Sequence, residues 1–109
     1  MNIEFNMQPG QVKIWLLDFV RDQLISFYKQ DTAITGARVS FREQDSLVEN
    51  NKICEIELTI YGNNIIASRG AASYNMAVKE VLAVLDFDVQ QHLQEQKEPP
   101  DIVVSTVKV

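Results

Sequence analysis

Apolar residues recur at two different spacings along the chain, and the changes of spacing predict where its helices and strands lie. Residues 2–7 alternate, with Ile3, Phe5 and Met7 on one side, which predicts a short strand. Between residues 11 and 30 the apolar positions return every three or four residues, which predicts a helix with one buried face. That face consists of Val12, Leu16, Phe19, Val20, Leu24 and Phe27.

Three more strands are predicted after this helix, because residues 37–43, 53–61 and 65–70 alternate between apolar and polar side chains. Gly62-Asn63-Asn64 supplies a tight turn between the last two strands, so these form a hairpin. If Phe41 lies opposite Ile56 in the preceding pair, Arg42 lies opposite Glu55, and the outer face carries ion pairs across the strands. The three strands together are predicted to form an antiparallel meander.

A second helix is predicted from Ser73, a suitable N-cap, to about Lys97, since Pro99-Pro100 ends it. Residues 102–109 are mostly β-branched and predict a final strand. The order β-α-β-β-β-α predicts an α+β fold: a two-layer sandwich of one four-stranded mixed sheet with two helices on one face, plus a C-terminal tail strand. Residues 1–98 are expected to form this domain, and residues 99–109 a Pro-Pro linker and the tail.

Composition and charge restrict the function further. The 109 residues suffice for one domain, and their 46% hydrophobic and 23% charged content is typical of a globular protein. The start of the chain lacks the features of a signal peptide, no apolar run reaches the roughly 20 residues of a membrane helix, and one cysteine allows no internal disulfide. We therefore expect a cytoplasmic protein with no membrane contact. The net charge of −5 weighs against nucleic-acid binding, which relies on lysine and arginine.

Candidate catalytic groups are few. His92, near the end of the second helix, has no cysteine partner and no clear Asp or Glu partner at metal-ligand spacing, and is interpreted as a solvated side chain. Cys54 shares a strand face with three large apolar residues and is interpreted as part of the core. Glu55 and Glu57 point to the opposite face, where pairing with arginine is expected rather than acid–base catalysis. The sequence also lacks a glycine-rich phosphate loop, so it predicts a non-catalytic protein with no cofactor, no metal and no small-molecule substrate.

The second helix is apolar on more than one face. Besides a core stripe it carries Met76, Val84 and Phe87 away from the centre of that stripe. An uncovered tail strand would leave a second adhesive surface. We therefore predict a protein interface that includes Met76, Val84, Phe87, Val103 and Val107. Either the chain's own tail covers it, or a second chain does, as a homo-oligomer through the second helix or the tail strand; both alternatives stay open.

A further pattern is carried by residues that shape the fold. It comprises Asp18-Phe19-Val20, Leu24 and Phe27 in the first helix, the strand 54–61 with Gly62 and Ile65-Ile66-Ala67 after it, and Ser73-Tyr74 leading into Ala77-Val78. Over about residues 1–96 this pattern resembles the ribosome hibernation-promoting factor family, also known as ribosome-associated inhibitor or sigma-factor modulation proteins. The resemblance implies a bacterial protein that binds the small ribosomal subunit, where messenger and transfer RNA would lie, and regulates translation in the stress response.

The resemblance also implies RNA contacts by basic side chains on both helices. The corresponding positions are Gln23, Ser26 and Lys29 in the first helix and Val84, Phe87 and Gln91 in the second, so only Lys29 is basic. The basic helix residues that are left as candidate RNA contacts are Arg21, Lys29 and Lys79. Two hypotheses follow. One is a ribosome-associated translation inhibitor; the other is a protein-interaction or homodimerisation module in which an apolar face of the second helix replaces the RNA-binding face.

Overall fold

The computed structural model describes residues 1–44, 47, 49–60 and 64–97. Its helices and strands are, in chain order, β1 (Asn2–Asn6), α1 (Ile14–Gln30), β2 (Ile34–Glu43), β3 (Lys52–Ile60), β4 (Ile65–Ala71) and α2 (Tyr74–Lys97). This order of elements is the one that the sequence predicts. The tail strand, with Val103 and Val107, and the tip of the predicted hairpin turn lie outside the described residues.

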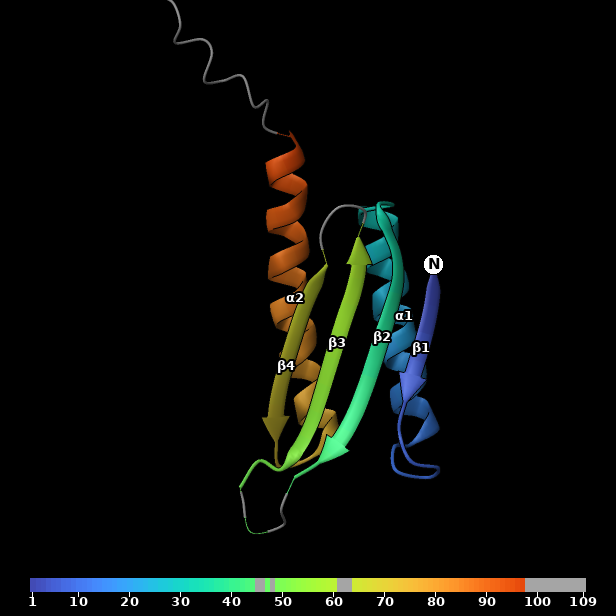
Figure 1. The fold of residues 1–109 in the computed structure, drawn as a ribbon, viewed down its shortest axis with the longest axis vertical. Coiled ribbons are helices and arrows are strands. Elements are labelled where there is room, and N and C mark those ends of the chain that lie inside the picture. Colours follow the sequence, from blue (N-terminus) through green and yellow to red (C-terminus); the bar gives the residue numbers. More distant parts are fainter. Residues whose placement is uncertain (45–46, 48, 61–63, 98–109) are drawn as a thin grey trace, which may run out of the picture.

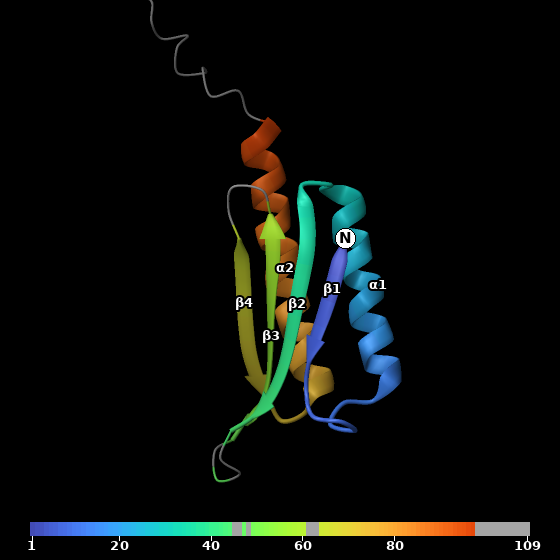
Figure 2. The same cartoon turned by 45° about the vertical axis from the view of Figure 1, so that its right-hand side comes forward.

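The four strands form one sheet in the order β1-β2-β3-β4 (Figure 1). β1 pairs with β2 in parallel, whereas β2 with β3 and β3 with β4 pair antiparallel. Both helices cover the same face of the sheet and run in the same direction, while no described helix covers the opposite face (Figures 1 and 2). The predicted α+β two-layer sandwich, with a four-stranded mixed sheet, is therefore confirmed.

The register between β2 and β3 differs from the predicted one by two residues. Val39, not Phe41, lies opposite Ile56, and Phe41 lies opposite Cys54. β2 also begins three residues earlier than predicted, with an irregularity in the pairing between Ile34 and Gly36. A shift by two residues leaves every side chain on its original face, so alternation predicts the faces but not the pairs.

The core lies between the sheet and the two helices. Its fully buried members include Val20 and Leu24 of α1, Ile56 and Leu58 of β3, and Val81 and Leu85 of α2. Cys54 is fully buried in the same cluster, as predicted. Phe19, which the sequence analysis assigns to the buried face, is 38% exposed. It lies about 100° around the helix from Val20 and so falls on the edge of a narrower buried stripe.

α1 begins three residues after the predicted start, because residues 11–13 belong to the connection that follows β1. In this connection the Gln11 side chain accepts a hydrogen bond from the Gln8 backbone N–H at 2.7 Å. The same side chain donates a hydrogen bond to the Tyr74 hydroxyl. The connection is thereby tied to the first residue of α2, and the N-terminal ends of the two helices are held beside each other.

α2 begins at the predicted place. The backbone N–H of Met76 donates to Ser73 Oγ at 3.2 Å, which confirms Ser73 as the capping residue. The helix has 24 residues, so it is about 36 Å long. Its last turns consequently extend past the end of the sheet (Figure 1).

Candidate functional site

The helix layer, meaning α1 and α2 together, turns one side to the sheet and the other outward. Six of its large apolar side chains are at least 37% exposed: Ile14, Trp15, Phe19 and Ile25 on α1, and Met76 and Phe87 on α2. Large apolar side chains that gather on one face of a protein usually mark an interaction site. The outer face of the helix layer is therefore the candidate binding surface.

The three predicted RNA contacts lie in the helix layer but do not come together. Lys29 is in the last turn of α1, and Lys79 is in the second turn of α2. Because the two helices run in the same direction, these lysines lie toward opposite ends of the layer (Figure 1). Arg21 lies over the Phe5 ring, 5.2 Å from its centroid, and its guanidinium is 3.1 Å from the Asp18 carboxylate. The three residues form no basic cluster.

Acidic residues balance the basic ones on this surface. Counting Lys13, which directly precedes α1, the described basic side chains of the layer are Lys13, Arg21, Lys29 and Lys79, all exposed. The exposed acidic side chains of both helices are Asp18, Asp22, Glu80 and Asp86 over the described residues. A surface that binds RNA phosphates needs an excess of positive charge, and four charges of each sign provide none.

The predicted protein interface is partly exposed and partly packed. Met76 is 50% and Phe87 62% exposed, and Ala83 lies between them on the same side of α2, because positions i, i+7 and i+11 share one helix face. We call these three residues the α2 stripe. Val84 is half-buried and packs against the core instead, while Val103 and Val107 lie outside the described residues.

An apolar hollow of about 210 Å³ opens between the N-terminal ends of the two helices. Its walls are Gln11, Val12, Lys13, Trp15 and Leu16 on the α1 side, and Ser73, Tyr74 and Asn75 on the α2 side. Lys13 is the one charged residue among them. The hollow therefore continues the apolar surface from Trp15 to the first turn of α2, and its size suits an apolar side chain of a partner.

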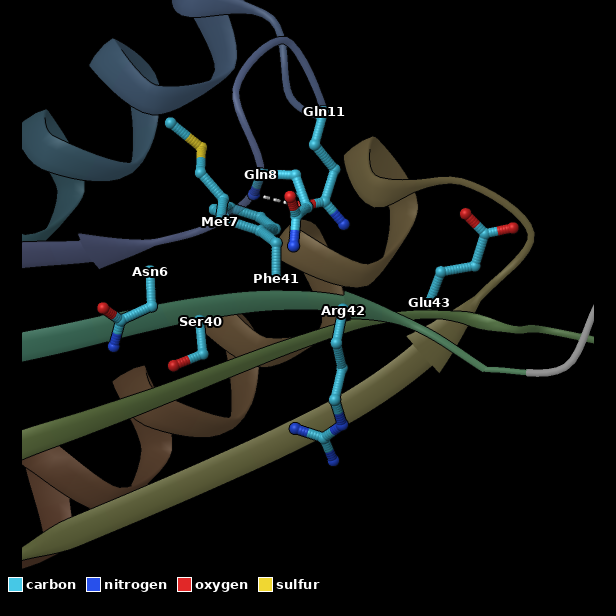
Figure 3. A pocket seen from close by; sticks show the side chains of 8 residues that line it. All are labelled: Asn6, Met7, Gln8, Gln11, Ser40, Phe41, Arg42 and Glu43. Carbon is cyan, nitrogen blue, oxygen red and sulfur yellow. Dashed lines mark hydrogen bonds between the residues drawn. The ribbon is translucent and has the colours of Figure 1, made fainter.

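A larger hollow, of about 590 Å³, lies beside β2 beyond the end of β1 (Figure 3). It exists because the pairing of β1 with β2 ends at Asn6 and Ser40, three residues before β2 itself ends. Figure 3 labels its lining, which is Asn6, Met7, Gln8, Gln11, Ser40, Phe41, Arg42 and Glu43. Both charged residues already have partners, since Arg42 pairs with Glu55 at 3.3 Å and Glu43 with Lys52 at 2.7 Å.

Charged residues on the open face of the sheet form pairs across strands. Arg38 lies directly opposite Glu57 at 4.0 Å, and its Nε is 3.5 Å from Glu4 Oε1. Arg42 reaches Glu55 diagonally rather than from the opposite position that the sequence analysis expected. Exposed pairs of this kind stabilise a protein by up to about 1 kcal/mol. Glu55 and Glu57 thus form ion pairs across the strands of the sheet, as predicted.

His92 is half-buried, and the interpretation as a solvated side chain is wrong. Its Nδ1 lies 2.6 Å from Oδ2 of Asp31, which is buried at the C-terminal end of α1. Asp31 Oδ1 also accepts a hydrogen bond from the Ala33 backbone N–H at 3.1 Å. Nearby, Gln90 donates to the Gln30 side chain. Asp31 and His92 are 61 positions apart, so no local spacing could indicate their contact.

Cys54 is not a reactive thiol in the folded protein. Burial raises its pKa to about 12, and the neighbouring charge of Glu55 acts in the same direction. The thiol therefore stays protonated at neutral pH. Elsewhere in the described part of the chain, no three His, Cys, Asp or Glu side chains are grouped so that they could hold a metal ion. None of the described helices is both long and apolar enough to span a membrane.

Solved structures share this fold. A ribosomal subunit interface protein from Coxiella burnetii is similar with a TM-score of 0.71 and 16% identity, over 86% of this chain and 99% of that one. The N-terminal domain of Protein Y from Thermus thermophilus has a TM-score of 0.68 and 16% identity, over 84% and 99% of the two chains. No family model matches the sequence, and no curated protein matches it. At this identity the likeness establishes the fold, which is the fold of the family that the sequence resembles.

Proposed function

We propose that this protein is a non-catalytic factor that associates with the ribosome and regulates translation in the cytoplasm. The observation that carries the proposal is the shared fold, which extends over 86% of this chain and nearly the whole of a ribosomal subunit interface protein. The sequence resemblance over about residues 1–96 supports the same role and points to the small subunit. Because one fold serves many functions, the contact requires a direct binding test.

The helix layer is the surface that we expect to face the ribosome. Lys29 and Lys79 are exposed and form no ion pair with a described residue, so both are free to contact phosphates. Arg21 is held by Asp18 and Phe5 and contributes less. Two phosphate contacts give a shallow dependence on salt, whereas a protein with six to ten such contacts loses about 10³- to 10⁵-fold in affinity between 50 and 200 mM.

Co-sedimentation with purified small ribosomal subunits at about 50 and about 200 mM salt tests this proposal. With two phosphate contacts the affinity should fall about tenfold over this range. Replacing both lysines, Lys29→Ala with Lys79→Ala, should remove most of that dependence. The control variant Arg42→Ala, on the open face of the sheet, should leave it unchanged. Absence of the protein from the pellet at the lower salt concentration would contradict ribosome association.

A second function is favoured by the apolar residues of the helix layer. Six exposed large apolar side chains and balanced charges are the properties of a protein-binding face rather than of an RNA-binding one. We therefore also propose a protein-interaction module on the same fold. The two functions are compatible, because a ribosome presents protein as well as RNA surfaces.

A further inference from the structure

We propose that the α2 stripe joins two copies of this chain, with their α2 helices antiparallel across a two-fold axis. This inference rests on the second of the two proposed functions and names its partner, which is the chain itself. Its test does not depend on ribosome binding, because the purified protein alone should show the dimer.

The α2 stripe has a shape that suits close packing of two helices. Met76 and Phe87 stand at its ends, and the small side chain of Ala83 lies between them. A small residue at the crossing point allows two helix axes to approach, while larger residues on both sides fill the space that is left. No described part of the same chain covers Met76 or Phe87, which are 50% and 62% exposed.

The charged residues beside the stripe are complementary to the same residues of a second copy. Lys79 and Asp86 are seven residues apart, so they lie on the same flank of α2, and both are exposed. Neither forms an ion pair with a described residue. In an antiparallel pair centred near Ala83, Lys79 of one copy lies beside Asp86 of the other. The two-fold axis repeats this contact, which gives two ion pairs from one pair of residues.

The surface can extend beyond the stripe. A stable dimer requires a total buried area of about 1,000 Å² or more, which one short stripe does not supply. Trp15 is 56% exposed and borders the apolar hollow that ends at Asn75, one helical turn before Lys79. Trp15 and the hollow thus lie beside the charged flank, on its side away from the stripe, and supply further apolar surface.

Sedimentation velocity of the purified full chain over a wide concentration range tests the proposal. We expect a monomer–dimer equilibrium in which Phe87→Glu raises the dissociation constant about tenfold or more. The control Ile66→Glu alters a residue of similar exposure, 58%, on the opposite face of the sheet, and should leave the equilibrium unchanged. A protein that stays monomeric at the highest concentration would refute the proposal. So would equal effects of both substitutions.

Exchanging the charges tests the pairing itself. Either Lys79→Asp or Asp86→Lys alone places like charges together and should weaken the dimer about tenfold. The double variant exchanges the two charges and should restore the original dissociation constant, because the cycle measures only their interaction. Additive weakening in the double variant would exclude this contact.

Cross-linking tests the orientation. The variant Ala83→Cys places a thiol next to the two-fold axis and should form a disulfide-linked dimer on mild oxidation. Gln94→Cys places it near the end of α2, far from its own copy in an antiparallel pair, and should not cross-link. The natural Cys54 is buried and does not interfere. Efficient cross-linking at residue 94 would overturn the antiparallel arrangement.

Discussion

At the scale of single residues, burial decides which side chains keep their ordinary chemistry. Cys54 has no exposed surface and lies on the core face of β3, among the apolar residues that the alternation of this strand predicts. Its neighbour Glu55 points to the other face and pairs with Arg42 there. A nucleophile needs a base and access to a substrate, so the position of this thiol in the sheet removes it from catalysis.

The raised pKa of Cys54 predicts how the stability depends on pH. In the unfolded chain the thiol ionises near pH 9, whereas in the folded protein its pKa is about 12. Stability should therefore not depend on this group below about pH 9 and should fall between about pH 9 and 12, because only the unfolded state can lose the proton there. Urea unfolding at several pH values measures this fall.

The variant Cys54→Ala provides the control for that experiment. It lacks the thiol, so its stability, although lower at neutral pH, should not show this part of the decline. Thiol-labelling reagents should also modify the natural protein only when urea unfolds it. Rapid labelling of the folded protein at pH 8 would contradict the burial of the thiol.

At the scale of elements, a polar contact fixes the end of α1 against α2. Asp31 ends α1, is 4% exposed, and holds His92 at 2.6 Å. Beyond Val89 no described residue of α2 is fully buried. The contact with Asp31 therefore holds the helix at a place where apolar packing has become sparse.

Removal of the Asp31 carboxylate should destabilise the protein. The variant Asp31→Ala leaves His92 without this partner and also removes the hydrogen bond to the Ala33 N–H. We expect a loss of about 2–4 kcal/mol in the free energy of unfolding, measured with urea. The matched variant Asp22→Ala changes an exposed residue of the same helix and should cost less than about 0.5 kcal/mol. Equal effects would show that the buried contact does not support α2.

The elements also show what the sequence could predict. Alternation and helical periodicity were sufficient to predict every described element. They also predicted which faces of β2 and β3 are buried, because burial selects one face of each strand. They were insufficient for the register, since Val39 and Phe41 are two residues apart and point to the same side. They also missed the pair of Asp31 with His92, because a contact between distant elements leaves no local pattern.

At the scale of the whole molecule, the open face of the sheet and the helix layer differ in whether their charged residues form ion pairs. The open face of the sheet pairs Arg38 and Arg42 with glutamates of neighbouring strands. The helix layer leaves Lys29 and Lys79 without an ion pair among the described residues and exposes large apolar side chains beside them. Periodicity predicted the exposure of Met76 and Phe87. The predicted interface did not include Ile14 and Trp15, which lie in the first turn of α1 and are exposed.

Added positive charge distinguishes an RNA contact of the helix layer from general attraction to the ribosome. The variant Asp22→Lys with Glu80→Lys places one new lysine on each helix, at exposed positions. If the layer faces RNA, binding to the small subunit should tighten, and each new phosphate contact should steepen the slope of log affinity against log salt by about one. Co-sedimentation at several salt concentrations measures both quantities.

The control for this variant places its lysines on the open face of the sheet, as Thr59→Lys with Ile66→Lys, both at exposed positions. If the helix layer makes the contact, these lysines should tighten binding less and leave the slope nearly unchanged, because they lie on the side of the sheet away from the helices (Figure 2). An equal gain from both variants would indicate attraction without orientation. No gain from either would indicate that the protein reaches its partner through the apolar residues of the helix layer and not through phosphates.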